Sequence, residues 1–186
     1  MRQHLQFKTV VLTLVLATAA LAGLSPAYAA PARVLDEDAQ TALEALYETA
    51  PAAKALSAQA KGILVFPYIH KAALVVGAQS GDGVMFRNGR IVGHYRVDGL
   101  LAGFEAGAQS YGYAMFFMSD AALQRMSSVK GFEIGADPNI VVVDAGAAKE
   151  VSTSTAQADV YGYVFNQKGL MGGIALQGLK ITKTGG

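Results

Sequence analysis

Glycine residues inside apolar runs constrain this chain more than any other feature of its 186-residue sequence. The glycines that lie within or beside runs of branched and aromatic residues are Gly77, Gly112, Gly162, Gly172, Gly173 and Gly178. Within a strand, glycine marks a bulge, a sharp bend or the close approach of two backbones. The pattern therefore predicts a strongly curved antiparallel sheet, or a partial barrel.

Much of the remaining sequence is typical of strands. Runs rich in branched and aromatic residues are bounded by Gly, Asp or Pro, and they span residues 63–66, 73–79, 111–118, 140–144 and 160–165. The dipeptide Asn88-Gly89 predicts a hairpin with a two-residue type I′ turn, because both positions of that turn need a positive φ. The sheet is therefore expected to be predominantly antiparallel and rich in glycine.

Three helices are predicted beside this sheet. The first begins at Asp36 and ends near Ala50, because apolar residues recur at helical spacing and acids occupy its N-terminal end. Pro51 ends this helix and opens a second, short one, for which Gly62 is the expected C-terminal cap. Ser119 is the expected N-cap of a third short helix. The fold class is therefore α+β, with two N-terminal helices and one short mid-chain helix.

The first 29 residues have the pattern of a cleaved signal peptide. A basic start precedes an apolar run over residues 9–24, and Ala27-Tyr28-Ala29 has the small-x-small pattern of a cleavage site. The alternative is a membrane anchor, but the run is shorter than the ~20 residues that span a bilayer. We expect residues 1–29 to be removed and residues 30–186 to form a single domain. The protein is then exported, and it is periplasmic, associated with the outer envelope, or secreted.

The composition excludes several classes of protein. Charged residues make up only 16% of the chain and hydrophobic residues 52%, which is incompatible with intrinsic disorder. The absence of Cys excludes a disulfide scaffold and a thiolate metal site. A net charge of +1 without runs of like charge offers little electrostatic attraction for a nucleic acid. We therefore expect no metal, no cofactor and no nucleic-acid partner.

The predicted hairpin has two unlike faces. When the strands are paired outward from Asn88-Gly89, opposed residues share a face and the face alternates at each step. One face then carries Arg87, Arg90, His94 and Arg96 beside Met85 and Val92, and the other carries Val84, Phe86, Ile91 and Tyr95. The four basic residues are termed the basic strip. Because guanidinium groups match phosphate in bidentate fashion, the strip predicts contact with lipid headgroups. The alternative is an ordinary solvent-exposed face, which the acidic first helix could screen.

Electrostatic attraction alone would bind lipid weakly. Each basic residue near an anionic surface contributes only ~1 kcal/mol, so apolar contact must supplement the strip. The aromatic candidates for this contact are Phe66, Tyr68, Tyr111, Tyr113, Phe116 and Phe117. The alternative for each of them is a place in the core, where apolar strand residues usually lie.

Signals for catalysis are weak. Ser110 lies in a near match to a nucleophile elbow, but an α/β-hydrolase needs its His after the Ser. The three histidines, His4, His70 and His94, all precede Ser110. Gly81-Asp82-Gly83 lacks the Lys-Ser/Thr of a phosphate-binding loop. We therefore expect a protein that is not an enzyme.

Several short motifs follow one another in a recognisable order. They are AKGILVFP (60–67), KAALVVG (71–77), GDG (81–83), GAQS (107–110), VVVDAG (141–146), KGLM (168–171) and LQGLKI (176–181). Together they resemble the SYLF-domain family in its exported bacterial form, over about residues 36–182. The resemblance implies a lipid-binding domain whose partners are phospholipids or fatty-acyl ligands, met by peripheral membrane contact.

The function expected from these observations is non-catalytic binding of phospholipid or another anionic lipid at the bacterial envelope. The alternative is a structural or protein-interaction module of the envelope, with protein partners that the sequence does not identify. The residues expected to bind lipid are Arg87, Arg90, His94, Arg96, Lys61, Lys71, Phe66 and Tyr68.

Overall fold

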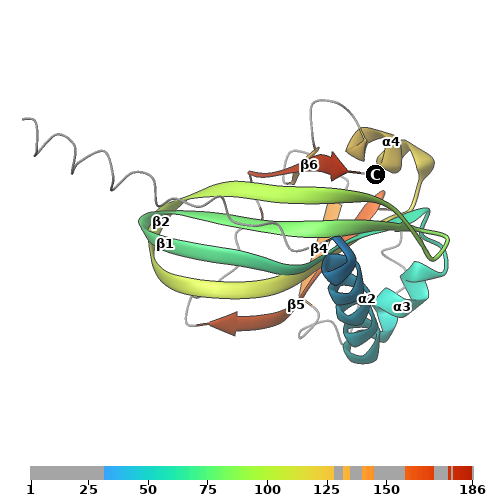
Figure 1. The fold of residues 1–186 in the computed structure, drawn as a ribbon, viewed down its shortest axis with the longest axis horizontal. Helices are drawn as coiled ribbons and strands as arrows, with labels where there is room; N and C mark the ends of the chain where they lie inside the picture. The colour runs from blue at the N-terminus through green and yellow to red at the C-terminus, as the bar shows by residue number, and fades with distance from the viewer. Residues whose placement is uncertain are drawn as a thin grey trace, which may run out of the picture. The chain divides into compact units, whose positions relative to one another are not determined.

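Two long strands organise the fold. β1 (Gly62–Arg87) and β2 (Arg90–Phe117) pair antiparallel from the turn at Asn88-Gly89 to their far ends (Figure 1). The computed structural model describes residues 32–127, 132–134, 140–144, 158–169, 176 and 178–185. Asn88 and Gly89 have φ angles of 50° and 71°, as a type I′ turn requires. The predicted hairpin is confirmed.

Four shorter strands extend this hairpin into one six-stranded sheet with the order β3-β6-β2-β5-β4, and β1 pairs with β2 off this path. They are β3 (Phe132–Ile134), β4 (Ile140–Asp144), β5 (Val160–Gly169) and β6 (Leu179–Gly185). β6 pairs with β2 near the turn, whereas β5 pairs with the C-terminal half of β2. Every pairing is antiparallel except that of β4 with β5. The predicted α+β class with a mainly antiparallel sheet is confirmed.

Both long strands bend sharply near their middles. The register between them shifts at the bend, because Leu74 pairs with Ala106 and Val76 pairs with Ala102. One residue of β1 lies between these two pairs, whereas three residues of β2 do, so β2 has extra residues on the outside of the bend. Gly77 lies directly against the carbonyl oxygen of Ala72, which leaves no room for a Cβ atom. The prediction that glycine permits a close backbone approach is confirmed at this position.

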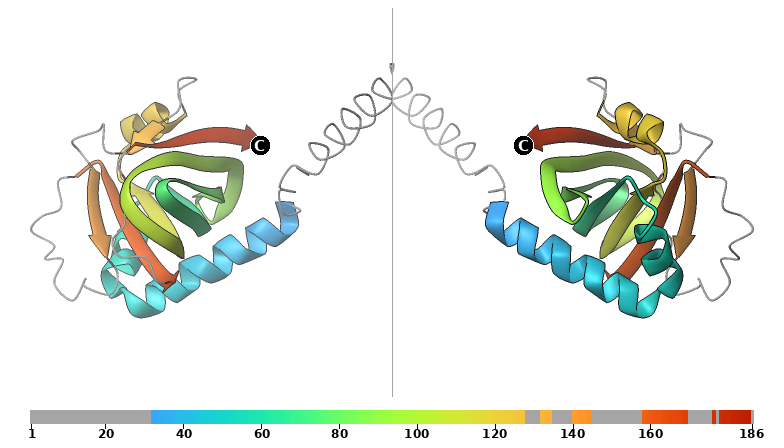
Figure 2. Two further views of the ribbon diagram at one scale, coloured as in Figure 1. Left: turned by 90° about the vertical axis from the view of Figure 1, so that its left-hand side faces the viewer. Right: turned by 90° about the vertical axis from the view of Figure 1, so that its right-hand side faces the viewer.

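The two halves of β1 then lie over each other. Gly81 packs against the backbone of Tyr68 and Ile69, and Gly83 packs against the ring of Phe66. The sheet consequently curls into a nearly closed partial barrel (Figure 2). Residues 72–78 of β1 and 99–108 of β2 are termed the apolar bend. Among the glycines of the sequence pattern, Gly172 and Gly173 lie outside the described residues.

The sheet has one hydrophobic cluster on each face. The interior cluster is formed by side chains from β1, β2, β3, β5 and β6, and α4 (Asp120–Met126) closes it with Ala122, Leu123 and Met126. The outer cluster lies between the other face of the sheet and the helices α2 (Ala32–Thr49) and α3 (Pro51–Ser57). All three helices lie toward the end of the long strands that carries the turn (Figure 1). Residues 31–186 form one compact unit that contains both clusters.

The three helices occur where they were predicted, but two boundaries differ. α2 begins four residues before Asp36, so its acids do not lie in the first turn; instead Asp36 reaches across to β2. Gly62 is the first residue of β1 rather than a helix cap, because α3 already ends at Ser57. Ser119 caps α4 as expected, and its Oγ accepts a hydrogen bond from the backbone N–H of Ala122 at 3.2 Å.

The long strand β1 also passes through Pro67, which was expected to end a strand. The register between β1 and β2 shifts between Phe66 and Ile69, and proline is tolerated in a sheet at such a bulge. The segments 63–66 and 73–79 are therefore parts of one strand.

Substitution of Gly77 by Ala should destabilise the protein. The added methyl group would meet the backbone of Ala72 and Ala73, which cannot move aside as a flexible side chain can. We expect Gly77→Ala to lower the free energy of unfolding by about 1–3 kcal/mol, the usual range for overpacking. Chemical denaturation of the chain from residue 30 measures this. The control is Gly185→Ala, whose Cβ would meet only the His94 ring at 3.9 Å. Equal stability of both variants would contradict the packing of this bend.

Candidate functional site

A bulge divides the basic strip between the two faces of the sheet. Arg87 pairs with Arg90 and Phe86 with Ile91 as predicted, but Met85 pairs with Gly93, so Val92 is an extra residue in β2. From this point the pairing is shifted by one residue. His94 and Arg96 therefore lie opposite Val84 and Asp82, on the outer face, whereas Arg87 and Arg90 share the face of Met85. The prediction of one continuous basic face is wrong, since a bulge reverses the alternation of side chains.

Carboxylates engage most of the cations of the strip. Arg96 donates from Nε to both oxygens of Asp98 at 3.1 Å and from an Nη atom to Asp82 at 3.2 Å. The His94 ring lies 2.8 Å from Asp36 of α2. The acidic first helix thus meets the strip at His94, as the sequence suggested. Each contact reduces the charge that these side chains present to an anionic ligand.

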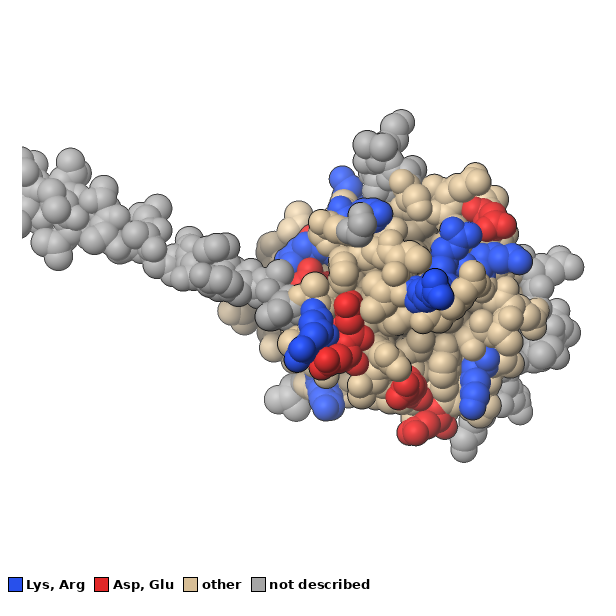
Figure 3. Space-filling model, turned by 45° about the vertical axis from the view of Figure 1, so that its right-hand side comes forward, with Lys and Arg blue, Asp and Glu red and all other residues tan. Residues whose placement is uncertain are grey.

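The remaining cations of this region are exposed near the turn. Arg87 lies 3.5 Å from Asp120 of α4, and Arg90 is exposed beside it. Lys61 is also exposed, immediately before β1. Acidic and basic side chains alternate over this end of the molecule (Figure 3). The turn end therefore presents mixed charges rather than a basic field.

Two of the other residues expected to bind lipid are buried. Phe66 belongs to the interior cluster, where its ring packs over Gly83. Lys71 is only 1% exposed and faces the interior opposite Gln109. As surface contacts these two predictions are wrong, because the curl of the sheet turns both side chains inward. Tyr68 is exposed as expected, and its ring stacks on His70 with the centroids 6.4 Å apart.

Lys71 belongs to a small polar layer inside the partial barrel. Gln79 and Gln109 are also buried, and the hydroxyl of Tyr111 donates to Oε1 of Gln79 at 2.7 Å. Burial raises the pKa of the Tyr111 hydroxyl well above its ordinary value, so it remains a donor throughout the physiological range. This layer separates the interior cluster from the apolar bend.

The apolar bend carries the most exposed large hydrophobic side chains among the described residues. Leu74, Val76 and Leu100 are 80%, 69% and 84% exposed. Glu105 is the one charged residue in the sequence of this bend. We expected apolar contact from aromatic residues, and the pattern of the sequence did not reveal these aliphatic ones. Continuing the register of the hairpin outward from the turn could have indicated them, because it brings the apolar runs of residues 72–78 and 99–108 opposite each other.

Because the long strands fold back on themselves, the apolar bend and the turn lie at opposite ends of the folded hairpin (Figure 1). Gly62 at the start of β1 lies beside Asn88 and Gly89 of the turn, while Gly77 lies in the middle of the strand. Ten residues separate Gly77 from Arg87, which corresponds to about 33 Å of extended chain. Arg87 and Arg90 therefore cannot contact the same small ligand as the bend.

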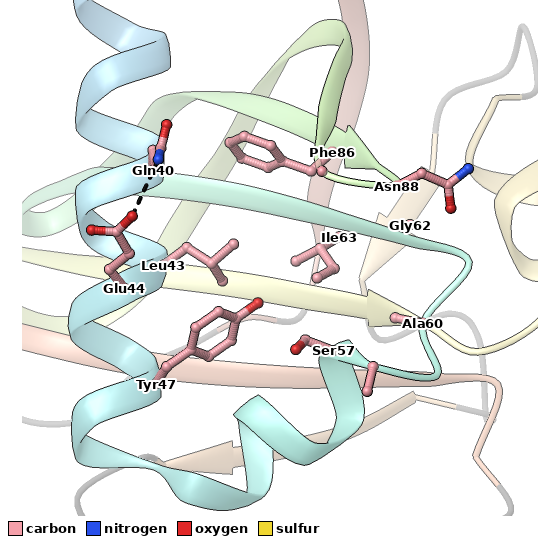
Figure 4. A pocket seen from close by; sticks show the side chains of 12 residues that line it. Gln40, Leu43, Glu44, Tyr47, Ser57, Ala60, Gly62, Ile63, Phe86 and Asn88 are labelled. Carbon is pink, nitrogen blue, oxygen red and sulfur yellow. Dashed lines mark hydrogen bonds between the residues drawn. The ribbon is translucent and has the colours of Figure 1, made fainter.

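A groove of about 490 Å³ lies at the turn end, between α2, α3 and the start of β1. Leu43, Ile63 and Phe86 form its apolar lining (Figure 4), and the hydroxyl of Tyr47 is hydrogen-bonded to Ser57. Gln40 and Glu44 are joined by a hydrogen bond of 3.2 Å at its rim. The carboxylate of Glu44 makes this groove unfavourable for an anionic headgroup.

Two further observations concern the described residues alone. They contain no group of three or more His, Asp or Glu side chains that could hold a metal ion. They also contain no helix long and apolar enough to cross a membrane. The predicted signal peptide, residues 1–29, lies outside the described residues.

Comparison with known proteins identifies the C-terminal part of the chain. Residues 98–185 match the family Ysc84, described as Las17-binding protein actin regulator. This part of the chain matches the SYLF-domain family. The resemblance inferred from the order of the motifs is thereby confirmed over these residues. No curated protein matches the chain.

The SYLF region includes the second strand of the apolar bend and all of β5 and β6. SYLF domains are binding modules linked to lipids or to protein partners, and they are not a known enzyme family. The functional question for this chain is therefore which surface binds, and what it binds.

The contact between Asp36 and His94 should stabilise the attachment of α2. Both side chains are less than one-third exposed, and a hydrogen bond to a charged group of this kind contributes about 1.5–3 kcal/mol. We expect Asp36→Ala to lower the free energy of unfolding by that amount. The control is Glu37→Ala, because the Glu37 carboxylate is paired, among the described residues, with the exposed Arg33 alone at 3.5 Å, and exposed pairs contribute little. Equal effects of the two substitutions in chemical denaturation would contradict this role of Asp36.

Proposed function

We propose that this chain is an exported bacterial protein that binds phospholipid or another anionic lipid at the envelope, by peripheral contact and without catalysis. The observation that carries the proposal is the apolar bend, where Leu74, Val76 and Leu100 are exposed together at one end of the sheet. SYLF domains are linked to lipid and to protein ligands. An exposed apolar tip favours the lipid.

Insertion of the bend into a bilayer would supply much of the binding energy. Full burial of a Leu or Val side chain contributes about 1.5–3 kcal/mol, so the three side chains together contribute roughly 4.5–9 kcal/mol. A dissociation constant near 1 μM corresponds to about 8 kcal/mol. Insertion with modest electrostatic help therefore gives reversible membrane binding, which is typical of peripheral proteins.

Export is supported by the sequence of residues 1–29. The apolar run there is followed by a small-x-small cleavage pattern, which would deliver the remaining chain across the inner membrane. A cysteine-free chain needs no oxidation to fold in that compartment. We propose that the periplasm or the outer envelope is where the bend meets lipid.

A protein-interaction module is the second candidate function. The matching family is described by its binding to a protein, Las17. In this chain β4 is the last strand of the sheet order, and its Val142 is exposed. An exposed strand edge can pair with a strand from another chain.

Acidic substitutions in the bend should abolish membrane binding. We expect Leu74→Asp/Leu100→Asp to reduce co-sedimentation with vesicles of phosphatidylcholine and phosphatidylglycerol by at least about tenfold, since 1.4 kcal/mol already corresponds to that factor. Both side chains are exposed, so the fold should be retained. The chain from residue 30 is used, because it contains the whole compact unit.

The matched control is Val34→Asp/Val92→Asp, which adds the same two charges at exposed apolar positions away from the bend. This control should bind as the unaltered chain does. Equal binding of both double variants, or no binding of the unaltered chain to any vesicle, would refute the lipid-binding proposal and favour the protein-interaction module.

The turn end should contribute little to the same assay. Arg87→Ala/Arg90→Ala removes two cations that lie about 30 Å of chain length from the bend, and Arg87 is already paired with Asp120. We therefore expect vesicle binding to be retained by this variant. Loss of binding with an unchanged circular dichroism spectrum would assign the lipid contact to the turn instead.

A further inference from the structure

Three polar side chains lie in a row across the outer face of the sheet, next to the apolar bend. His70 of β1 pairs with Ser110 of β2, and Ser110 pairs with Lys168 of β5. Directly opposed residues share a face, and adjacent strands are about 4.8 Å apart. The three side chains are termed the polar row. They span about 10 Å of the surface, and α2 and α3 do not cover them, because His70 and Lys168 are exposed.

A bulge in β5 brings Lys168 to this face. Gly112 pairs with Phe165 and Ser110 with Lys168, so three steps along β5 correspond to two along β2. Asn166, within this bulge, has a φ of 52°, a left-handed conformation that Asn tolerates better than most residues. Phe165 packs in the outer cluster. Without the extra residue, Lys168 would alternate to the opposite face from Ser110.

The strand segments that form the polar row contain no acid. No Asp or Glu occurs in the sequence segments 66–78, 106–117 and 160–169, which form this part of the three strands. Lys168 has no ion-pair partner among the described residues. The corresponding lysine on the other half of the curled sheet is Lys180, which pairs in register with Asp98 and Glu133. Lys180 therefore lies beside acids, whereas the strand segments around Lys168 contain none.

The polar row offers the donors that a phosphate group needs. A Lys ammonium supplies up to three N–H donors, a Ser hydroxyl one, and an imidazole one or two. All of them can point toward a single tetrahedral anion above Ser110. Charge-assisted hydrogen bonds from ammonium to phosphate are stronger than bonds between neutral groups.

The position of the row relative to the bend fits the layers of a bilayer. Leu74 and His70 lie on the same face, four residues apart, which corresponds to about 13 Å along the strand. Peripheral elements bury their apolar side chains about 5–10 Å into the boundary between headgroups and acyl chains. When Leu74 lies among acyl chains, His70 lies at the level of the phosphates. Tyr68, stacked on His70, lies one step further out, as aromatic residues often do at membrane interfaces.

We infer that His70, Ser110 and Lys168 form a binding site for the phosphate of a phospholipid headgroup, adjacent to the inserted bend. The inference rests on the lipid-binding function proposed above and assigns its headgroup contact. The geometry explains how a chain of nearly balanced charge can prefer a phosphate-bearing surface: the donors are concentrated on strand segments that contain no acid.

The test compares two lysines of equal charge. We expect Lys168→Ala to weaken binding to phosphatidylcholine–phosphatidylglycerol vesicles about fivefold, the effect of one basic residue near such a surface. Lys180→Ala removes the same charge beside two acids and should leave binding unchanged. Lys168→Arg keeps the donors and should retain binding. Lys168 and Lys180 are both exposed, so neither substitution should disturb the fold.

Two further arms identify the phosphate as the ligand. On vesicles of digalactosyldiacylglycerol, which carry no phosphate, the unaltered chain and Lys168→Ala should bind equally. Inorganic phosphate should displace the unaltered chain from phospholipid no more than sodium chloride at the same ionic strength. Stronger displacement would show a site for free phosphate and overturn the headgroup assignment.

The outcomes separate this inference from the proposed function. Suppose that Leu74→Asp/Leu100→Asp loses binding, as the proposed function expects. The polar row alone would then be overturned if Lys168→Ala and Lys180→Ala bound phospholipid vesicles equally well. It would also be overturned if Lys168→Ala lost as much binding on galactolipid vesicles as on phospholipid vesicles. Failure of the unaltered chain to bind any vesicle would overturn both.

Discussion

The close contact between Gly77 and the backbone of Ala72 is the constraint on which the rest of the structure depends. It lets a hairpin of two long strands fold over itself in the middle, and Gly81 and Gly83 then accept the first half of β1 at short range. Folding the sheet in this way creates the interior cluster. It also has an unavoidable consequence: the residues on the outside of the bend have no part of the sheet to pack against. The exposed apolar side chains and the buried core therefore have the same origin.

The helices cover only part of the outer face. α2 and α3 pack over the end of the sheet that carries the turn, where Val65, Phe116 and Tyr163 form the outer cluster. Beyond them, toward the bend, the outer face changes to Ala72, Ala108 and the polar row, which are small or polar. The described helices do not cover this part of the outer face. One end of the molecule is thus devoted to packing, and the other presents apolar and then polar surface to its surroundings.

The sequence predicted local structure well where a local rule applies. Asn88-Gly89 determines its own turn, and Ser119 its own helix cap, since neither needs distant contacts. It failed where one extra residue changes a register. Val92 in β2 and Asn166 in β5 each reverse the alternation of side chains, so the basic strip is divided and Lys168 joins His70. Neither bulge has a composition signal of its own. Burial of Phe66 and Lys71 likewise depends on the curl of the whole sheet. The glycines of the sequence indicated that the sheet curls, but they did not indicate which side chains would face its interior.

The distribution of acids determines how this nearly neutral chain can meet an anionic surface. Near the turn, carboxylates hold Arg87, His94 and Arg96, so cations there stabilise contacts within the protein. Near the bend, the segments that carry His70 and Lys168, residues 66–78 of β1 and 160–169 of β5, contain no acid. Attraction to phosphate therefore arises from where acids are absent rather than from an excess of bases. Since the same end also carries Leu74, Val76 and Leu100, apolar and electrostatic forces act in one direction and favour one orientation, with the bend toward the lipid.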